Sequence, residues 1–245
     1  MSEIETPFPR PLSGAKVTRL PSGLIPSRTV LEGKTVDLEP IDPARHSAQL
    51  YVAGHGSSER DAIWDYLAYG PWADEAAMTG WLHGCAASHD PMFFAIRPKD
   101  GGKAVGMCSY LNIVPGNGSI EIGHIWFGPE LQRTRAATEA LFLLLDYAMT
   151  DLGYRRMEWK CNALNERSRH AAHRLGFRFE GVFYNHLIFK GMNRDTAWFS
   201  ILDDEWPEVR GHLAAWLSDD NFDDDGKAKT SLVAAMQNRT PSKRD

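Results

Sequence analysis

The chain has 245 residues and a net charge of −5, and its ordinary share of apolar residues allows one globular domain with a sizeable core and extensions at its ends. Acidic and basic residues are interspersed, which excludes the basic surface expected of a nucleic-acid-binding protein. Its three cysteines follow neither a CxxC nor a histidine-spaced pattern, so we expect no disulfide framework and no metal site.

The chain shows no targeting or membrane segment by composition. Its first residues contain no apolar run of signal-peptide length, and no later run approaches the roughly 18 apolar residues of a membrane span. We therefore expect a cytoplasmic protein whose partners include neither a membrane nor a nucleic acid.

The first half of the chain predicts an arm, then helices, then strands. Residues 1–33 are rich in proline, serine and glycine, which predicts an irregular N-terminal arm. A domain over 34–218 follows, and it begins with a strand at 35–41 and helical stretches at 42–56, 58–68 and 73–89. Glycine-rich turns then separate three strands of an antiparallel meander, at 91–99, 102–115 and 118–129.

The second half predicts helices that alternate with strands. The clearest helix covers 135–153, where apolar residues recur at helical spacing and Gly153 ends the pattern. It is followed by a strand at 154–163, a helix at 165–177, strands at 177–189 and 195–202, and a helix at 203–217. A helical crossover lets its flanking strands lie parallel, so we expect an α/β (α+β) fold with a mixed, mostly antiparallel sheet flanked by helices.

Residues 219–245 are first acidic and then basic, which predicts a C-terminal tail. An amphipathic turn that docks on the domain through Leu232, Val233 and Met236 is the alternative.

The corner between the strand at 118–129 and the long helix has the sequence LQRTRAATEAL, residues 131–141. A helix N-terminus presents unpaired amides and the positive end of the helix dipole, so it can bind a phosphate group through its backbone alone. Arg133 and Arg135 stand where a phosphate loop would have small residues.

Residues from about 35 to 205 resemble the GNAT superfamily of acetyl-CoA-dependent N-acetyltransferases, and within it the ribosomal-protein-alanine N-acetyltransferase branch. The segments that carry the resemblance are EIGHIWFGPELQRTRAATEAL, CNALNERSRHAAHRLGFRFEG and RDTAWFSIL. The resemblance implies a GNAT-type sheet with acetyl-CoA as the acetyl donor.

The resemblance also implies a set of cofactor-binding residues. In this family the strand before the loop binds the pantetheine arm, and a Gln/Arg-x-x-Gly-x-Gly/Ala loop wraps the pyrophosphate with backbone amides. Arg135 replaces the glycine; a positive φ there would cost about 1–2 kcal/mol, whereas a helical Arg135 would cost almost nothing and add donors near the phosphates. The residues implied to bind acetyl-CoA are Ile125, Trp126, Phe127, Gln132, Arg133, Thr134, Arg135, Ala136, Ala137, Thr138 and Asn165.

Asn165 opens an Asn-x-x-Ser motif whose asparagine bonds the cofactor arm in relatives; it would otherwise be only a helix cap. The motif also contains Ser168, which we take as the candidate acid that protonates the leaving thiolate. Many relatives use a tyrosine for this step, at the position of Ala172 in this chain. Tyr184 is a more distant candidate.

Transfer to an amine also needs a proton acceptor. Glu121 is the first candidate because it precedes Gln132 by eleven residues, the separation of the general-base glutamate in relatives; a salt-bridged strand glutamate is the alternative. His124 is the second candidate, but its odd separation from Glu121 predicts the opposite sheet face unless the strand bulges.

The expected function is an N-acetyltransferase that moves an acetyl group directly from acetyl-CoA to a primary amine, as a monomer or homodimer. The acceptor is a protein N-terminus, an amino acid or a small amine. The alternative is a catalytically weak or inactive CoA-binding protein with the same fold, as Arg135 and Ala172 suggest. Aromatic residues that could line the acceptor side, or simply fill a core, are Trp64, Tyr66, Trp72 and Trp81.

Overall fold

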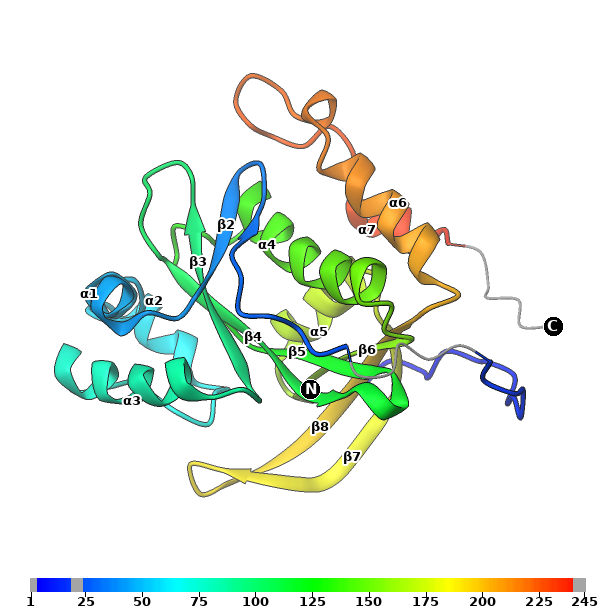
Figure 1. The fold of residues 1–245 in the computed structure, drawn as a ribbon, viewed down its shortest axis with the longest axis horizontal. Coiled ribbons are helices and arrows are strands. Elements are labelled where there is room, and N and C mark those ends of the chain that lie inside the picture. Colours follow the sequence, from blue (N-terminus) through cyan, green and yellow to red (C-terminus); the bar gives the residue numbers. More distant parts are fainter. Residues whose placement is uncertain (1–3, 19–23, 240–245) are drawn as a thin grey trace.

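The computed structural model describes residues 4–18 and 24–239. At its centre lies one eight-stranded sheet with the order β1-β2-β3-β4-β5-β6-β8-β7 (Figure 1). Neighbouring strands are antiparallel except β5 and β6, which run parallel, so the expected mixed sheet is confirmed. The strands are β1 (Leu31–Glu32), β2 (Val36–Pro40), β3 (Met92–Pro98), β4 (Gly106–Val114), β5 (Ser119–Phe127), β6 (Arg156–Asn162), β7 (Arg178–Phe189) and β8 (Met192–Leu202).

Helices lie on both sides of this sheet, which is why the first five residues of β3 are apolar and buried without alternation. Phe94 and Ile96 belong to the core beneath α4, whereas Phe93 and Ala95 belong to a second core beneath α1 and α3. The helices are α1 (Pro43–Gly54), α2 (Ser58–Asp61), α3 (Glu75–Ala87), α4 (Arg135–Asp146), α5 (Glu166–Arg174), α6 (Trp206–Trp216) and α7 (Leu232–Gln237). No helix in the described ranges has the length and apolarity that crossing a membrane requires.

The α4 helix forms where the sequence predicts it because its apolar stripe is buried against the sheet. Leu141, Leu144 and Leu145 lie in the core, and a wider π-type turn, η3 (Tyr147–Asp151), continues the helix. Glu139 on α4 accepts hydrogen bonds from the amides of Lys34 and Thr35, at 2.6 and 2.7 Å, which fixes the start of β2 against the helix.

The helical stretch expected over 58–68 is shorter in the structure. The α2 helix ends at Asp61, and a 3-10 turn, η1 (Ala62–Trp64), closes it. The fully buried Trp64 donates its indole N–H to the carbonyl of Gly54 at 2.8 Å. Tertiary anchoring of this side chain overrides the local helical pattern.

The described part of the N-terminal arm is irregular up to β1; it contacts the body of the protein on either side of residues 11–18, which are exposed and loop outward (Figure 1). The Phe8 amide donates to the Phe179 carbonyl at 3.1 Å, and the Arg178 guanidinium lies 3.6 Å from the centre of the Phe8 ring. Farther along the arm, the carbonyl of Leu24 accepts a hydrogen bond from the Tyr154 hydroxyl at 2.7 Å.

The prediction of a tail from residue 219 is wrong for residues 219–239, which fold back onto the domain. A short turn, η4 (Asp219–Asn221), and a bridge between Phe222 and Ala228 lead into α7, which packs on α5 and α6 (Figure 1). Although this segment is rich in charged residues, it carries two apolar side chains one helical turn apart, Leu232 and Met236, and both are buried in the main core. Residues 240–245 lie outside the described part of the chain.

Docking of α7 predicts a stability effect. Leu232 is 2% exposed, so Leu232→Ala should lower the free energy of unfolding in urea by about 2–3 kcal/mol through lost burial and a cavity. The neighbouring Val233 is 42% exposed, and Val233→Ala should change the free energy of unfolding by less than about 0.5 kcal/mol. Equal effects of the two substitutions would contradict the docked helix.

Candidate active site

The two parallel strands of the sheet separate after a short paired stretch. β5 and β6 pair only from Ser119 with Arg156 to Glu121 with Glu158, although β5 continues to Phe127 and β6 to Asn162. The β5 edge beyond Glu121 is therefore not hydrogen-bonded to β6. We call this divergence the splay; Ile125, Trp126 and Phe127, predicted to flank the pantetheine arm, lie along it.

The loop after β5 ends in a capped helix N-terminus. Thr134 caps α4 by accepting the Ala137 amide at 3.1 Å, and the Gln132 side chain donates to the Phe127 carbonyl at 3.0 Å. The amides of Arg135 and Ala136 stand in the first turn, where a helix provides no acceptor, and they donate to no other described residue. These two N–H groups are available to an anion.

Arg135 is the first residue of α4, so the position that replaces the family glycine is helical; the positive φ of the loop falls on Arg133, at 64°. The guanidinium of Arg135 is held by the C-terminal segment. It donates to the carbonyl of Leu217 and to Asp219, the latter at 2.9 Å, and it lies 4.4 Å from the centre of the Phe222 ring. The C-terminal segment thus engages the Arg135 guanidinium, and its expected contribution at the phosphates stays a prediction.

Thr138, one turn into α4, is also engaged by a neighbouring helix. Its hydroxyl accepts a hydrogen bond from Arg174 of α5 at 2.9 Å, and the Arg174 guanidinium lies 4.7 Å from the centre of the Trp216 ring. These contacts tie α4, α5 and α6 together behind the loop.

The Asn-x-x-Ser motif lies at the start of α5, beside the end of β6. The Asn165 side chain accepts the Ser168 amide at 3.1 Å and so caps the helix. The Ser168 hydroxyl accepts the Trp159 indole N–H at 3.0 Å. Burial raises the pKa of the Cys161 thiol to about 11, and Ser168 opposes this rise. Ala172 is fully buried and Tyr184 is 76% exposed on the outer strand β7, so neither stands where Ser168 does.

Glu121 stands where the splay begins, on the sheet face opposite α4, which we call the Glu121 face. The carboxylate is buried, and its Oε2 accepts hydrogen bonds from Asn112 at 2.6 Å and from Lys160 at 2.8 Å. Burial raises the pKa of Glu121 even though Lys160 and Asn112 oppose the rise. Oε1 has no hydrogen-bond partner among the described residues.

A chain of charges continues from Glu121 along β6. Lys160 also pairs with Glu158 at 2.9 Å and lies 3.9 Å from the centre of the Trp198 ring. Glu158 in turn accepts from Arg156 at 2.7 Å; burial opposes its ionisation, but the bonds to Arg156 and Lys160 lower its pKa overall. Sequence analysis missed Lys160, although its alternation with Glu158 on a strand signals a shared face.

The prediction that His124 faces away from Glu121 is wrong, because β5 bulges. Met107 on β4 pairs with Trp126 and Ser109 pairs with Gly123, so two residues of β5 oppose Cys108, and His124 has a φ of 51°. His124 therefore packs on Phe93 in the core opposite α4, on the Glu121 face. Burial lowers the pKa of His124 to about 4, helped by the nearby Arg194, so the imidazole is neutral near pH 7.

Aromatic side chains border His124. The Tyr69 hydroxyl lies 3.1 Å from His124 Nδ1, and the Tyr69 ring packs on Trp72 and Trp81. Trp64, by contrast, is fully buried as core. Tyr66 is partly exposed, and its hydroxyl donates to the Leu164 carbonyl after β6 at 3.3 Å. Trp72 and Trp81 thus reach His124 through Tyr69, which the sequence pattern did not single out, and Trp64 packs on Tyr69 and Trp72 from within the core.

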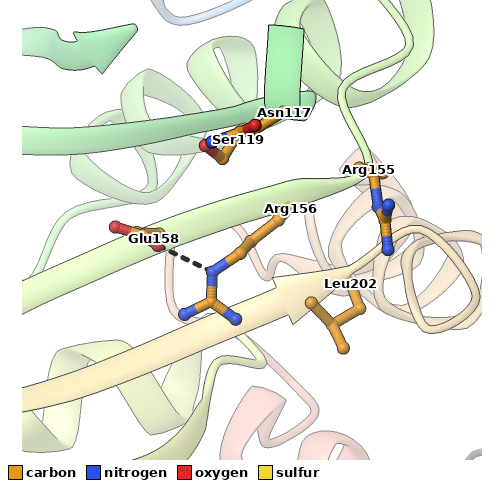
Figure 2. A pocket seen from close by; sticks show the side chains of 6 residues that line it. All are labelled: Asn117, Ser119, Arg155, Arg156, Glu158 and Leu202. Carbon is orange, nitrogen blue, oxygen red and sulfur yellow. Dashed lines mark hydrogen bonds and ion pairs between the residues drawn. The ribbon is translucent and has the colours of Figure 1, made fainter. Parts of the chain in front are cut away.

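A cavity of about 400 Å³ opens at the paired end of the splay, away from the α4 N-terminus. Figure 2 shows Arg156 and Glu158 joined by a hydrogen bond on β6, with Asn117 and Ser119 across from them. Because Glu158 also contacts Lys160, the charge chain links this cavity to Glu121. The candidate donor site lies elsewhere, on the open part of the splay.

Comparison with known proteins identifies the family. The model of the acetyltransferase (GNAT) domain matches residues 36–178, more than half of the chain. A curated relative, "Putative ribosomal N-acetyltransferase YdaF" of Bacillus subtilis, is 33% identical over 105 residues, which cover 43% of this chain and 57% of that protein. The chain thus aligns with a little over half the length of this relative.

Solved structures agree over more of the chain. A GCN5-related N-acetyltransferase from Brucella melitensis is 44% identical with a TM-score of 0.84, covering 86% of this chain and 96% of that one. A probable acetyltransferase of the GNAT family from Chromobacterium violaceum is 41% identical with a TM-score of 0.71, covering 84% of this chain and 100% of that one. With its splayed β5 and β6 and its capped α4, the chain belongs to the GNAT acetyltransferase family.

Proposed function

We propose that this enzyme transfers an acetyl group from acetyl-CoA directly to a primary amine, on a protein N-terminus, an amino acid or a small amine. The observation that carries the proposal is the open helix N-terminus of α4, placed directly after a strand whose far edge is unpaired. The ribosomal name of one relative favours a protein N-terminus among these acceptors.

The residues present fit the donor. The amides of Arg135 and Ala136 supply N–H groups and the positive helix end for a pyrophosphate. The backbone of Ile125, Trp126 and Phe127 along the splay would hold the pantetheine arm, and bound acetyl-CoA would supply an activated thioester. Arg133 and Thr134 shape the turn before the helix, while Gln132, Ala137, Thr138 and Asn165 hold the surrounding loop and helix starts in place.

Glu121 is the proposed proton acceptor for the attacking amine. A buried carboxylate with a raised pKa is a better base than an exposed one, and Lys160 opposes the rise by favouring the ionised form. Its unbonded Oε1 is free to accept the proton, directly or through a water molecule. His124 shares the face, but its lowered pKa makes it a weaker base.

Ser168 is the proposed proton donor to the leaving thiolate. The Trp159 indole occupies one of its acceptor positions, so the hydroxyl hydrogen is directed elsewhere. The position of Ser168 beside the end of β6, across the splay from β5, supports this role.

Calorimetric titration with acetyl-CoA, followed by a thiol-release assay against a panel of amines, tests the proposal. We expect binding of acetyl-CoA and release of CoA that depends on the amine. Binding without release on any amine would favour the alternative of an inactive CoA-binding protein. Absence of binding would overturn both.

A further inference from the structure

Arg194 is a cation for which the described part of the chain provides no acceptor. It lies on β8 opposite Leu187, two residues before Thr196, which pairs with Asn162 at the end of β6. Its Nε is buried without a hydrogen-bond partner, and no ion pair joins it to a described carboxylate. Arg156 on the neighbouring strand, in contrast, bonds both Glu158 and Glu180.

Strand alternation places Arg194 on the Glu121 face. Ala197 and Phe199 point into the core beneath α4, so Thr196 and Trp198 point the other way, and Arg194 follows their register. Two neighbours on this face sense its charge. Arg194 contributes, after burial, to the lowered pKa of His124, and Cys161 and then Glu121 partly offset the lowering of the pKa of Arg194 by burial.

The tip of the hairpin that carries Arg194 is tied to the helical region beside it. The Arg194 guanidinium lies 4.6 Å from the centre of the Phe189 ring, which covers one of its faces. Next to Phe189, the Lys190 ammonium donates to the Trp64 carbonyl at 2.8 Å and joins the hairpin tip to η1. Phe189 thus stacks on Arg194, and Lys190 ties the same hairpin to the backbone of η1.

A buried polar group without a partner costs free energy, and for a charged group this cost is larger, so a ligand that satisfies the group is strongly favoured. A guanidinium stacked on a ring presents its edge, whose N–H groups match a carboxylate in a bidentate arrangement. The amides proposed for the donor phosphates lie on α4, which packs against the opposite sheet face. The group that satisfies Arg194 therefore belongs to the other substrate.

We infer that Arg194 binds a carboxylate of the acceptor and makes this enzyme selective for amines that carry a negative charge near the reacting nitrogen. The inference rests on the proposed acetyl transfer and narrows its acceptor class to amino acids and peptides with an acidic group.

Matched acceptor pairs test this selectivity. The probes are amino acids with their amides, and tripeptides with aspartate or asparagine at the second position. The wild-type enzyme should prefer the charged member by about 10- to 100-fold in kcat/KM, mainly through KM. Arg194→Gln should remove the preference by lowering kcat/KM for the charged member to that of the neutral one, while the Kd of acetyl-CoA stays unchanged. Arg194→Lys should restore part of the preference. Arg155→Gln, which removes an arginine at the cavity of Figure 2, is the matched control and should keep the preference.

Equal kcat/KM values of the wild type for both members of a pair would overturn the inference. So would an Arg194→Gln variant that loses kcat/KM equally on both members or binds acetyl-CoA more weakly. A readout without turnover separates this failure from failure of the proposed function. Calorimetry of the same pairs with the CoA-saturated protein should show tighter binding of the charged member, lost in Arg194→Gln. That result without acetyl transfer would uphold the carboxylate site and overturn the transferase proposal; equal binding of both members would overturn the site.

Discussion

Glu121→Gln is expected to lower kcat by about 10²- to 10⁴-fold while leaving the Kd of acetyl-CoA unchanged, because the substitution removes the proposed proton acceptor and keeps its shape. In the wild type, kcat/KM should fall as the pH falls through the pKa of Glu121, which burial raises, because the protonated carboxyl accepts no further proton. This acid limb should be absent from the residual activity of Glu121→Gln. Steady-state kinetics over a range of pH measure both effects.

Glu158→Gln is the matched control for this substitution. Glu158 shares the same lysine, at 2.9 Å against 2.8 Å for Glu121, so loss of either carboxylate removes one ion pair from Lys160. We expect Glu158→Gln to keep turnover within about threefold, since its pKa is lowered and it faces the cavity at the paired end of the splay. Equal losses in the two variants would assign Glu121 a structural role in the charge chain.

Two substitutions at position 135 should separate the backbone from the side chain in donor binding. Arg135→Pro removes the first amide of α4, and it suits a helix start because Thr134 before it is extended, with φ −91° and ψ 162°. We expect the Kd of acetyl-CoA to rise by about 10- to 100-fold, the effect of losing a hydrogen bond to a charged group. Calorimetric titration measures it.

Arg135→Ala keeps the amide and removes the guanidinium, which the structure ties to Leu217, Asp219 and Phe222. The Kd of acetyl-CoA should therefore stay within about threefold of the wild type. A large rise in Kd for Arg135→Ala, with little further change in Arg135→Pro, would show that the side chain and not the backbone binds the phosphates.

Local patterns predicted the parts of the fold that depend on local forces. The mixed sheet was predicted from the glycine turns of the meander and from the helical crossover between β5 and β6. The loop before α4 was predicted from the apolar stripe that marks this helix. Thr134 caps α4 from within the loop motif, and Asn165 caps α5 where the Asn-x-x-Ser motif begins. These features depend on neighbours within a few residues along the chain.

The features that sequence analysis missed depend on contacts across the fold. The bulge at His124 follows from the register between β4 and β5, and strand alternation alone could not show it. Arg135 lies near Asp219 only because the C-terminal segment folds back, and the two residues are far apart in sequence. The sequence around Arg194 carries no motif that points to a site. Only the pairing of β6, β7 and β8 brings this residue to the Glu121 face.

Transfer of a labelled acetyl group tests the central claim most directly. The protein is incubated with isotope-labelled acetyl-CoA and the charged acceptors described above, and the products are analysed by mass spectrometry. The account predicts that the label appears on the acceptor amine in step with release of CoA, and that Glu121→Gln slows both. Release of CoA with the label recovered as free acetate, or no release with any amine, would contradict it.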